Sequence, residues 1–348
     1  MSIKNLGIIG GGQLGSLLAV AAKKLNINTT IYCDDVDAPA QNFCNKFIYG
    51  KYDDKVKMQE FIKEIDVITY EFENIPYETL NEMNRVKPVL PKPSVNKLIQ
   101  HRIAEKDFVN KLNIRTTKYA SIESKSDIGP LGDFLPGILK TTTMGYDGKG
   151  QFIINNLEDL KSLDINFSKS FILEKLVKLK KEISVIITRF SNHKFEIYDP
   201  IENVHKDQIL ESSKIPAEIN EKLINVSKEW AIKIAEELKY IGTLCVEFFI
   251  DSNENLYVNE IAPRVHNSGH LTINAYNISQ FENHIRAVCS LEKISLKKIC
   301  NAKMINLIGN QILPYRQNIK FDKNQFFFDY LKKEIKEKRK MGHLTTLL

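Results

Sequence analysis

Short β-rich runs alternate with helical stretches through the first ninety or so residues, and this alternation constrains the fold more than any other feature. The β-rich runs cover residues 6–9, 29–32, 47–49 and 66–70. Strands that alternate with helices build a parallel sheet with helices on both faces. The sequence therefore predicts an α/β, Rossmann-like domain over residues 1–93.

A run of glycines follows the first of these strands and opens a helix. Gly10-Gly-Gly-Gln-Leu-Gly15 satisfies the GxGxxG pattern, and Asp34 and Asp35 end the next strand, roughly 20 residues further on. Taken alone, the pattern suggests a nicotinamide dinucleotide. It fits any phosphate equally well, because glycines let backbone N–H groups and the helix dipole approach closely. A tight structural turn is a third interpretation.

A connecting helix is predicted after this domain. Prolines between residues 88 and 93 end the alternation, and Ser94 is expected to cap a long helix within residues 94–116. Arg102 and Lys106 fall beside its inward apolar stripe. Inward cations need an anionic partner.

The rest of the chain divides into a small mobile lid and a larger C-terminal domain. Residues 117–177 hold short strands around the glycine-rich loop Gly145-Tyr-Asp-Gly-Lys-Gly150, a composition typical of a lid. Residues 178–348 contain a strand over 182–189, a helix over 216–238, an antiparallel hairpin of strands 243–250 and 256–261, and a helix with Ser279 and Glu282 at capping-box spacing.

Composition limits the partners of the chain. Its 348 residues suggest two or three domains, and a net charge of +6 from scattered residues favours anionic small molecules over nucleic acid. Five cysteines without a CxxC pair suggest neither zinc nor redox work and indicate a reducing, cytoplasmic setting. The N-terminal apolar stretch is shorter than the ~20 residues of a membrane span. No membrane or nucleic-acid partner is expected.

Two acidic positions on the hairpin predict a metal site. Glu247 lies inside an apolar strand, where an unpaired charge is costly, and Asn259 and Glu260 lie across the hairpin. Two carboxylates and an amide suit magnesium. The alternative is a buried salt bridge to Lys140, Arg102 or Arg264.

Two neighbouring segments carry further polar groups. Lys140 ends an apolar strand directly before the glycine-rich loop, so its ammonium is expected to meet a phosphate. The loop Ala262-Pro-Arg-Val-His-Asn-Ser-Gly-His270 follows the hairpin at a strand end, where substrate contacts are common. Arg264 and His266 are favoured for function, whereas His270 is equally compatible with a structural role.

Spaced together, these elements resemble the ATP-grasp superfamily: Lys140, residues 145–150, Glu174-Lys-Leu-Val177, Glu247 and Asn259-Glu260. Other segments resemble one family within it, the 5-(carboxyamino)imidazole ribonucleotide synthases of purine biosynthesis. They are residues 10–15, Asp66-Val-Ile-Thr-Tyr-Glu-Phe-Glu-Asn74, Glu202-Asn-Val-His205, residues 262–270, Met304-Ile-Asn-Leu-Ile-Gly309 and Arg339-Lys-Met-Gly-His343.

The resemblance implies an ATP-grasp fold with an N-terminal preATP-grasp domain, and a ligase that needs Mg²⁺ or Mn²⁺ but no biotin. ATP would phosphorylate bicarbonate to carboxyphosphate, and the exocyclic amine of 5-aminoimidazole ribonucleotide would capture the carboxyl group. Phosphoryl transfer depends on positioned cations more than on covalent help, which agrees with the residues found. A homodimer is also implied.

The resemblance further implies roles for individual residues. Arg264 and His266 would hold bicarbonate, Asp147 would orient the amine or the lid, and Lys340 would contact the ribonucleotide phosphate. Glu247 and Glu260 would hold the metal. The implied ATP contacts are Arg102, Lys140, Gly145, Tyr146, Asp147, Gly148, Lys149, Gly150, Glu174, Lys175, Leu176, Val177, Glu182, His205, Asn259 and Glu260. The implied substrate contacts are Gln13, Leu14, Glu73, Tyr146, Arg264, His266, Asn267, Ser268, Arg339 and Lys340.

Three rival functions stay open. A formate-dependent glycinamide ribonucleotide transformylase shares the glycine-rich start and the Ala-Pro-Arg loop, although residues 265–268 argue against it. An NAD-dependent dehydrogenase would explain the GxGxxG pattern and Asp34 but has no use for Glu247, Glu260 and Lys140. A non-catalytic nucleotide-binding scaffold would bind ATP without releasing phosphate.

Overall fold

The N-terminal unit is the parallel sheet that the sequence predicts. In a computed structural model that describes residues 3–128, 130–143, 151–163, 170–317 and 320–348, its strand order is β3-β2-β1-β4. Gly10 has a φ of 100°, so the turn after β1 needs a glycine. The elements are β1 Asn5–Ile9, α1 Gln13–Lys24, β2 Asn28–Cys33, β3 Lys46–Tyr49, α2 Lys55–Ile62, β4 Val67–Tyr70 and α3 Tyr77–Asn84.

The prediction of one long connecting helix within residues 94–116 is wrong. The segment forms two helices, α4 Pro93–Ile99 and α5 Arg102–Lys111. The chain turns at His101, whose ring Nδ1 accepts the Ala104 N–H. Ser94 is not the cap, because α4 already begins at Pro93, a residue whose fixed φ suits a first helical turn. The Arg102 N–H instead donates to the Thr142 carbonyl, which fixes α5 against the small sheet.

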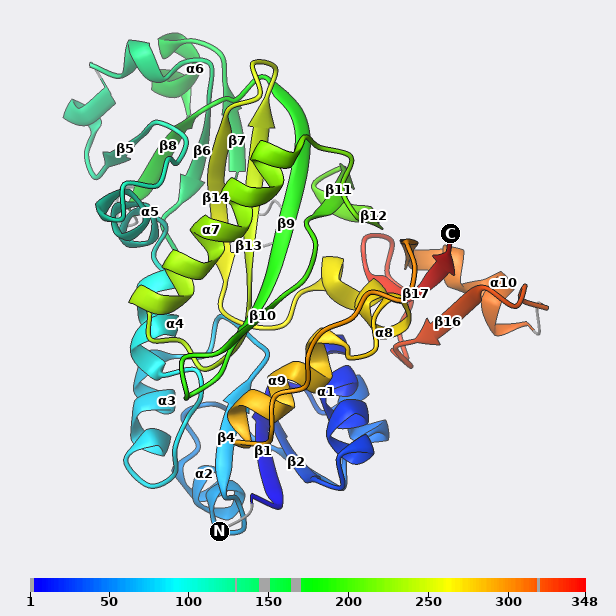
Figure 1. Cartoon of the computed structure of the whole chain (residues 1–348). Helices are drawn as coiled ribbons and strands as arrows, with labels where there is room; N and C mark the ends of the chain where they lie inside the picture. Colours follow the sequence, from blue (N-terminus) through cyan, green and yellow to red (C-terminus); the bar gives the residue numbers. More distant parts are fainter. Residues whose placement is uncertain (1–2, 129, 144–150, 164–169, 318–319) are drawn as a thin grey trace.

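The small sheet is antiparallel and has its own core. Its strand order is β5-β8-β6-β7, and it forms the upper left part of Figure 1. Fully buried Leu139 and Leu173 pack with Leu160 beneath it. The elements are β5 Tyr119–Ile122, β6 Gly137–Thr141, β7 Gln151–Ile154, α6 Leu157–Ser162 and β8 Phe171–Lys175.

The large sheet runs from the middle of the molecule to the C-terminus, in the order β14-β13-β9-β11-β12-β15-β17-β16, with β10 beside β9 (Figure 1). Helix α7 begins at Glu221, not at Pro216, because the Asn220 side chain caps it. The strands are β9 Leu179–Arg189, β10 Phe195–Ile197, β11 Ile201–Lys206, β12 Ile209–Ile215, β13 Gly242–Asp251, β14 Leu256–Ala262, β15 Ala302–Ile308, β16 Gln325–Asp329 and β17 Lys340–Leu347. The helices are α7 Glu221–Glu237, α8 Thr272–Ala275, α9 Gln280–Val288 and α10 Leu313–Arg316.

Helix α9 joins the large sheet to the N-terminal unit. Ser279 caps it as predicted, accepting the Glu282 N–H. Its His284 is fully buried between Thr69 Oγ1, 2.8 Å from Nε2, and the Thr243 N–H, which donates to Nδ1. Phe281 packs into the same core as α1. Helix α9 therefore lies against α1, the helix that the glycine-rich turn opens.

Within the described residues, no helix has the length and apolar character needed to cross a bilayer.

Candidate active site

Two carboxylates face each other across the β13–β14 hairpin. Glu247 pairs with Glu260 in the strand register, and the register shifts directly afterwards, so that Asn259 is the extra residue of a bulge. A bulge changes the direction of neighbouring side chains, and bulges are common beside active sites. Burial and the nearby Glu260 raise the pKa of Glu247 to about 8. A cation between the two carboxylates would relieve this cost, and their oxygens suit Mg²⁺.

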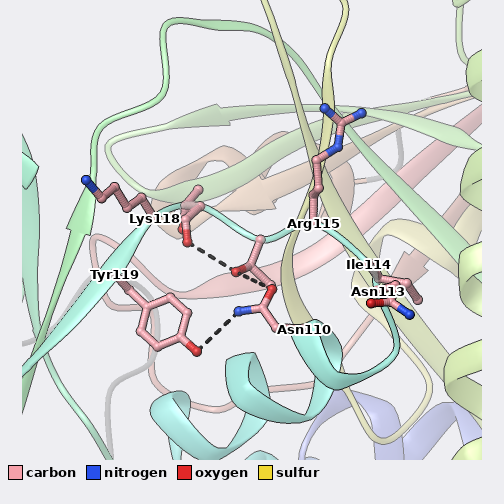
Figure 2. A pocket seen from close by; sticks show the side chains of 8 residues that line it. Asn110, Asn113, Ile114, Arg115, Lys118 and Tyr119 are labelled. Atoms are coloured by element: carbon pink, nitrogen blue, oxygen red, sulfur yellow. Dashed lines mark hydrogen bonds between the residues drawn. The ribbon is translucent and has the colours of Figure 1, made fainter.

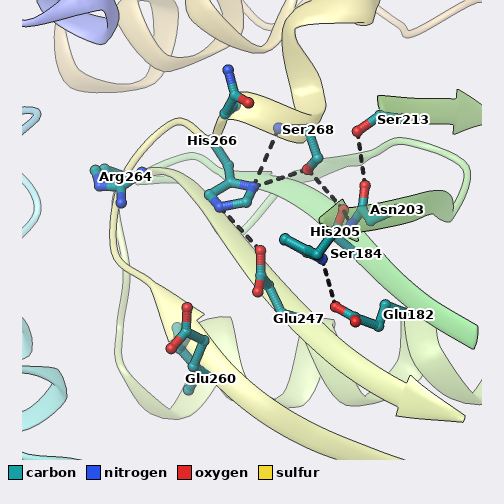
Figure 3. Close-up of polar contacts among 12 residues, drawn as sticks. Glu182, Ser184, Asn203, His205, Ser213, Glu247, Glu260, Arg264, His266 and Ser268 are labelled. Atoms are coloured by element: carbon teal, nitrogen blue, oxygen red, sulfur yellow. Dashed lines mark hydrogen bonds and ion pairs between the residues drawn. The ribbon is translucent and has the colours of Figure 1, made fainter. Parts of the chain in front are cut away.

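Each carboxylate also has a protein partner, and Figure 3 shows that of Glu247. His266 Nε2 lies 3.0 Å from Glu247 Oε1, and Arg102 Nη1 lies 3.5 Å from Glu260 Oε2. Burial and the nearby Arg264 hold the pKa of His266 well below its usual value, so its ring is neutral. Glu260 therefore pairs with Arg102, one of the cations that the salt-bridge alternative named. Glu247 instead lies beside the neutral imidazole of His266.

A buried lysine cluster lies behind this hairpin. Glu174 accepts from Lys140 and Lys106, each at 3.1 Å, and from Thr117 Oγ1 at 3.0 Å. Burial alone would raise the pKa of Glu174, but the two ammonium groups outweigh it and lower the pKa to about 2. Both Glu174 oxygens are occupied, so its side chain is a support for Lys140. Next to it, Lys175 and Leu176 are exposed and Val177 is half-buried, so this segment is open to a ligand.

Glu182 and His205 form a second pair on the large sheet, visible in Figure 3. Glu182 Oε2 lies 2.7 Å from His205 Nδ1. Burial lowers the pKa of His205, but the Glu182 carboxylate outweighs it and leaves that pKa raised. Glu182 lies on β9, the strand beside β13, in which Ser184 pairs with Glu247, and His205 lies on β11, on the other side of β9.

The loop after β14 connects the carboxylates to the N-terminal unit. Arg264 forms an ion pair with Glu73 and donates to the Val265 carbonyl. Burial raises the pKa of Glu73 in spite of this arginine. Since the same loop carries His266, it spans the space between Glu73 and Glu247.

The next residues of the loop are buried supports. Ser268 Oγ lies 2.9 Å from His266 Nδ1 and 2.8 Å from Ser184 Oγ. Asn267 exchanges two side-chain hydrogen bonds with Asn306 of β15. Asn267 and Ser268 were predicted substrate contacts, but their side chains are engaged with protein groups.

His270 is a structural member of this loop. It is fully buried and packs against the rings of Phe281, Tyr330 and His343. Neither ring nitrogen has a hydrogen-bond partner among the residues that the structure describes.

The glycine-rich turn of residues 10–15 lies against Glu71, a residue of the 66–74 segment for which the sequence predicts no role. The Gly12 N–H donates to Glu71 Oε1 at 2.6 Å, and a Cβ on Gly10 or Gly12 would meet Glu71 at 3.0 Å. The position usually taken by a dinucleotide phosphate is thus filled by a carboxylate. Carboxyl ends of neighbouring parallel strands meet at one sheet edge, so the Glu71-Phe-Glu73 segment could have indicated this contact.

A second missed residue, Lys332, joins the two ends of the chain. Its Nζ donates to Gln13 Oε1 at 3.1 Å and to the Lys340 carbonyl at 2.6 Å. The predicted contacts Gln13 and Lys340 are thereby brought together, with Arg339 beside them and Leu14 buried below. No local sequence pattern points to Lys332, because its partner Gln13 is 319 residues away.

The predicted residues Gly145, Tyr146, Asp147, Gly148, Lys149 and Gly150 lie outside the described residues.

A shallow surface depression lies on the connecting segment, lined by residues 110 and 113–119 (Figure 2). Its polar groups satisfy one another: Asn110 donates to the Tyr119 hydroxyl at 3.2 Å and accepts from Thr116 at 3.2 Å. Its lining residues include Arg115, Lys118 and Tyr119 but no carboxylate, so the chemistry is assigned to the Glu247–Glu260 region.

Comparison with known proteins agrees with this geometry. Residues 3–100 match the ribonucleotide synthetase preATP-grasp domain, residues 107–281 the ATP-grasp domain, and residues 302–348 the phosphoribosylaminoimidazole carboxylase C-terminal domain. An N5-carboxyaminoimidazole ribonucleotide synthase from Staphylococcus aureus (strain MRSA252) is 38% identical over 98% of this chain and 92% of that protein.

Two solved structures are also similar. N5-carboxyaminoimidazole synthetase from Staphylococcus aureus complexed with ADP has a TM-score of 0.92 at 36% identity, covering 100% of this chain and 94% of that one. N5-carboxyaminoimidazole synthase from Aspergillus clavatus, in complex with ADP and 5-aminoimidazole ribonucleotide, has a TM-score of 0.89 at 26% identity, with the same coverage.

The fold and the site define an ATP-grasp enzyme, an ATP-binding ligase. The chain belongs to the N5-carboxyaminoimidazole ribonucleotide synthase family of purine biosynthesis. The predicted fold class is confirmed, and the NAD-dependent dehydrogenase interpretation is wrong.

Proposed function

We propose that this protein uses ATP and bicarbonate to carboxylate the exocyclic amine of 5-aminoimidazole ribonucleotide. The products are N5-carboxyaminoimidazole ribonucleotide, ADP and phosphate. A bicarbonate oxygen attacks the γ-phosphorus of ATP, and ADP leaves. The amine nitrogen then attacks the carboxyl carbon, phosphate leaves, and the amine loses a proton.

One observation carries this proposal: the loop after β14 pairs Arg264 with Glu73 and His266 with Glu247. Glu73 belongs to the N-terminal unit and Glu247 to the large sheet. A group transferred between a nucleotide on the sheet and an amine on the N-terminal unit must pass along this loop. The Arg264 guanidinium can donate hydrogen bonds to bicarbonate where negative charge develops.

The cations of the lysine cluster support the phosphate side. Lys140 is buried and directed at Glu174, and Arg102 is paired with Glu260. Such fixed cations stabilise a transferring phosphoryl group with little rearrangement. Glu247 and Glu260, with Asn259, would hold Mg²⁺ or Mn²⁺, which neutralises phosphate charge when bound. Glu182, His205 and residues 174–177 would complete the ATP site.

The carboxylates of the N-terminal unit support the amine side. Because burial raises the pKa of Glu73, this residue can accept the proton that the amine loses. His266 in its observed position orients Glu247, and contact with bicarbonate would require its ring to turn. Gln13, Lys332, Arg339 and Lys340 supply the polar and positive groups for a ribonucleotide phosphate.

The assembly is part of the proposal. We expect a cytoplasmic homodimer without nucleic-acid or membrane partners, with residues 117–177 acting as the lid. Sedimentation of the purified protein tests the dimer.

The decisive experiment follows labelled bicarbonate. With Mg²⁺, ATP and 5-aminoimidazole ribonucleotide, label should enter the ribonucleotide as an acid-labile carbamate. Formate-dependent formylation of glycinamide ribonucleotide would identify a transformylase instead. ATP binding without phosphate release under any substrate would identify a scaffold.

A further inference from the structure

Three different metal-ligating groups converge at Glu247, which is also one of the proposed magnesium ligands. A thiol sulfur of Cys245, a carboxylate oxygen of Glu247 and a ring nitrogen of His266 lie within 4.8 Å of one another. Cys245 and Glu247 are two residues apart on β13, so their side chains point to the same face. His266 reaches them from the loop after β14. All three positions are therefore set by rigid or well-packed backbone.

The orientation of the imidazole is fixed by its neighbour. Ser268 Oγ lies 2.9 Å from His266 Nδ1, which leaves Nε2 directed at Glu247. Ser268 is in turn held by Ser184, and Ser184 by Asn203 at 3.0 Å, as Figure 3 shows. In metal sites, hydrogen-bond partners of this kind fix the orientation of the ligating ring and raise the affinity of the site for the metal.

This ligand set suits a softer ion than magnesium. Magnesium prefers oxygen ligands, whereas thiolate, imidazole and carboxylate together are typical of zinc. A divalent ion with one thiolate, one carboxylate and a neutral imidazole carries no net charge, which lowers the cost of burying it. Cys245 is fully buried, while the side chains of Glu247 and His266 are 12% and 14% exposed, so a water can complete a tetrahedron from their side.

We propose that Cys245, Glu247 and His266 form a binding site for a thiophilic divalent cation such as Zn²⁺, and that its occupation inhibits the enzyme. On binding, the thiol proton passes to solvent and a metal–sulfur bond forms. Inhibition follows because Glu247 and His266 are withdrawn from the reaction. Only the inhibition rests on the proposed function, because metal binding can be measured without turnover.

Cobalt absorption tests the site without any turnover. Co²⁺ is added to the metal-free full-length protein in a reducing buffer that contains no thiol. The wild type should show the near-ultraviolet charge-transfer band that requires a thiolate ligand, and Zn²⁺ should abolish it. Cys245→Ser and Cys245→Ala should lack the band, whereas Cys289→Ser, a matched change of a buried cysteine in another core, should keep it.

Inhibition is then measured with saturating Mg²⁺ and ATP. Cys245→Ser should keep the magnesium-dependent turnover, and its half-inhibitory Zn²⁺ concentration should rise by an order of magnitude or more. Absence of the band in the wild type, or its persistence in both Cys245 variants, would overturn the site. Equal inhibition of wild type and Cys245→Ser would overturn the link to inhibition. A wild type without turnover that still shows the band would refute the proposed function alone.

Discussion

Replacing Glu174 with Gln tests the buried lysine cluster in a quantitative way. The carboxylate is almost fully buried and contacts both Lys106 and Lys140. Its pKa falls from 4.5 to about 2, and since each pKa unit is worth about 1.4 kcal/mol, the contacts stabilise the fold by about 3 kcal/mol at pH 7. Removing one partner of a buried ion pair costs a similar ~3–5 kcal/mol.

The assay is urea unfolding at pH 7, followed down to acid pH. A carboxylate with a lowered pKa contributes stability above its unfolded pKa, so the difference between Glu174→Gln and wild type should shrink as the pH falls from 4.5 toward 2. ATP affinity should fall with it, because Lys140 loses its support. Glu60→Gln is the matched control: Glu60 pairs with Lys57 at 2.9 Å, but its side chain is 45% exposed, and no measurable change is expected. Equal stability of Glu174→Gln and wild type would refute the reasoning.

Three further predictions concern the substrate contacts and acid stability. Lys332→Met should raise the KM for the ribonucleotide by about tenfold and leave the KM for ATP unchanged, because a fixed ammonium is lost. Lys333→Met, a change of the exposed neighbour, is the control. Equal ribonucleotide KM values for Lys332→Met and wild type would contradict the assignment. Arg264→Lys should lower kcat by about 10²-fold with ATP affinity retained, since a lysine cannot reproduce the forked guanidinium; an unchanged kcat would exclude the role. Burial lowers the pKa of His284 and of His343 to about 3, so the unfolded chain binds more protons below pH 6.5. Stability should then fall by about 1.4 kcal/mol per histidine for each pH unit lost between 6.5 and about 3, and an equally steep fall in His284→Gln would contradict it.

Local periodicity was sufficient to predict the four parallel strands and the hairpin. The bulge of this hairpin at Asn259 was not predictable, because the register depends on which residues pair across the two strands. The break at His101 was missed for a similar reason. The helical pattern of residues 94–112 is continuous, and only the Thr142 carbonyl, supplied by the small sheet, fixes Arg102 at a new helix start.

The candidate site was predictable where chemistry is concentrated in short motifs. Glu247, Glu260, Arg264 and His266 are indeed brought together, although their roles stay predictions. The supports were not predictable: Asn306 from β15 holds the loop, and Glu105 accepts the Ile261 N–H at 2.6 Å, directly after Glu260. Burial and Glu260 raise the pKa of Glu105 to about 8. Such contacts depend on packing between distant segments, which no local pattern encodes.

Phosphate release from ATP shows whether ATP use is coupled to the ribonucleotide and to the carboxylate pair. It is measured with Mg²⁺ and bicarbonate, with and without 5-aminoimidazole ribonucleotide, on the wild type and on Glu260→Gln. Phosphate release should rise when the ribonucleotide is added and should be lost in Glu260→Gln. Release that ignores the ribonucleotide, or that survives in Glu260→Gln, would contradict it.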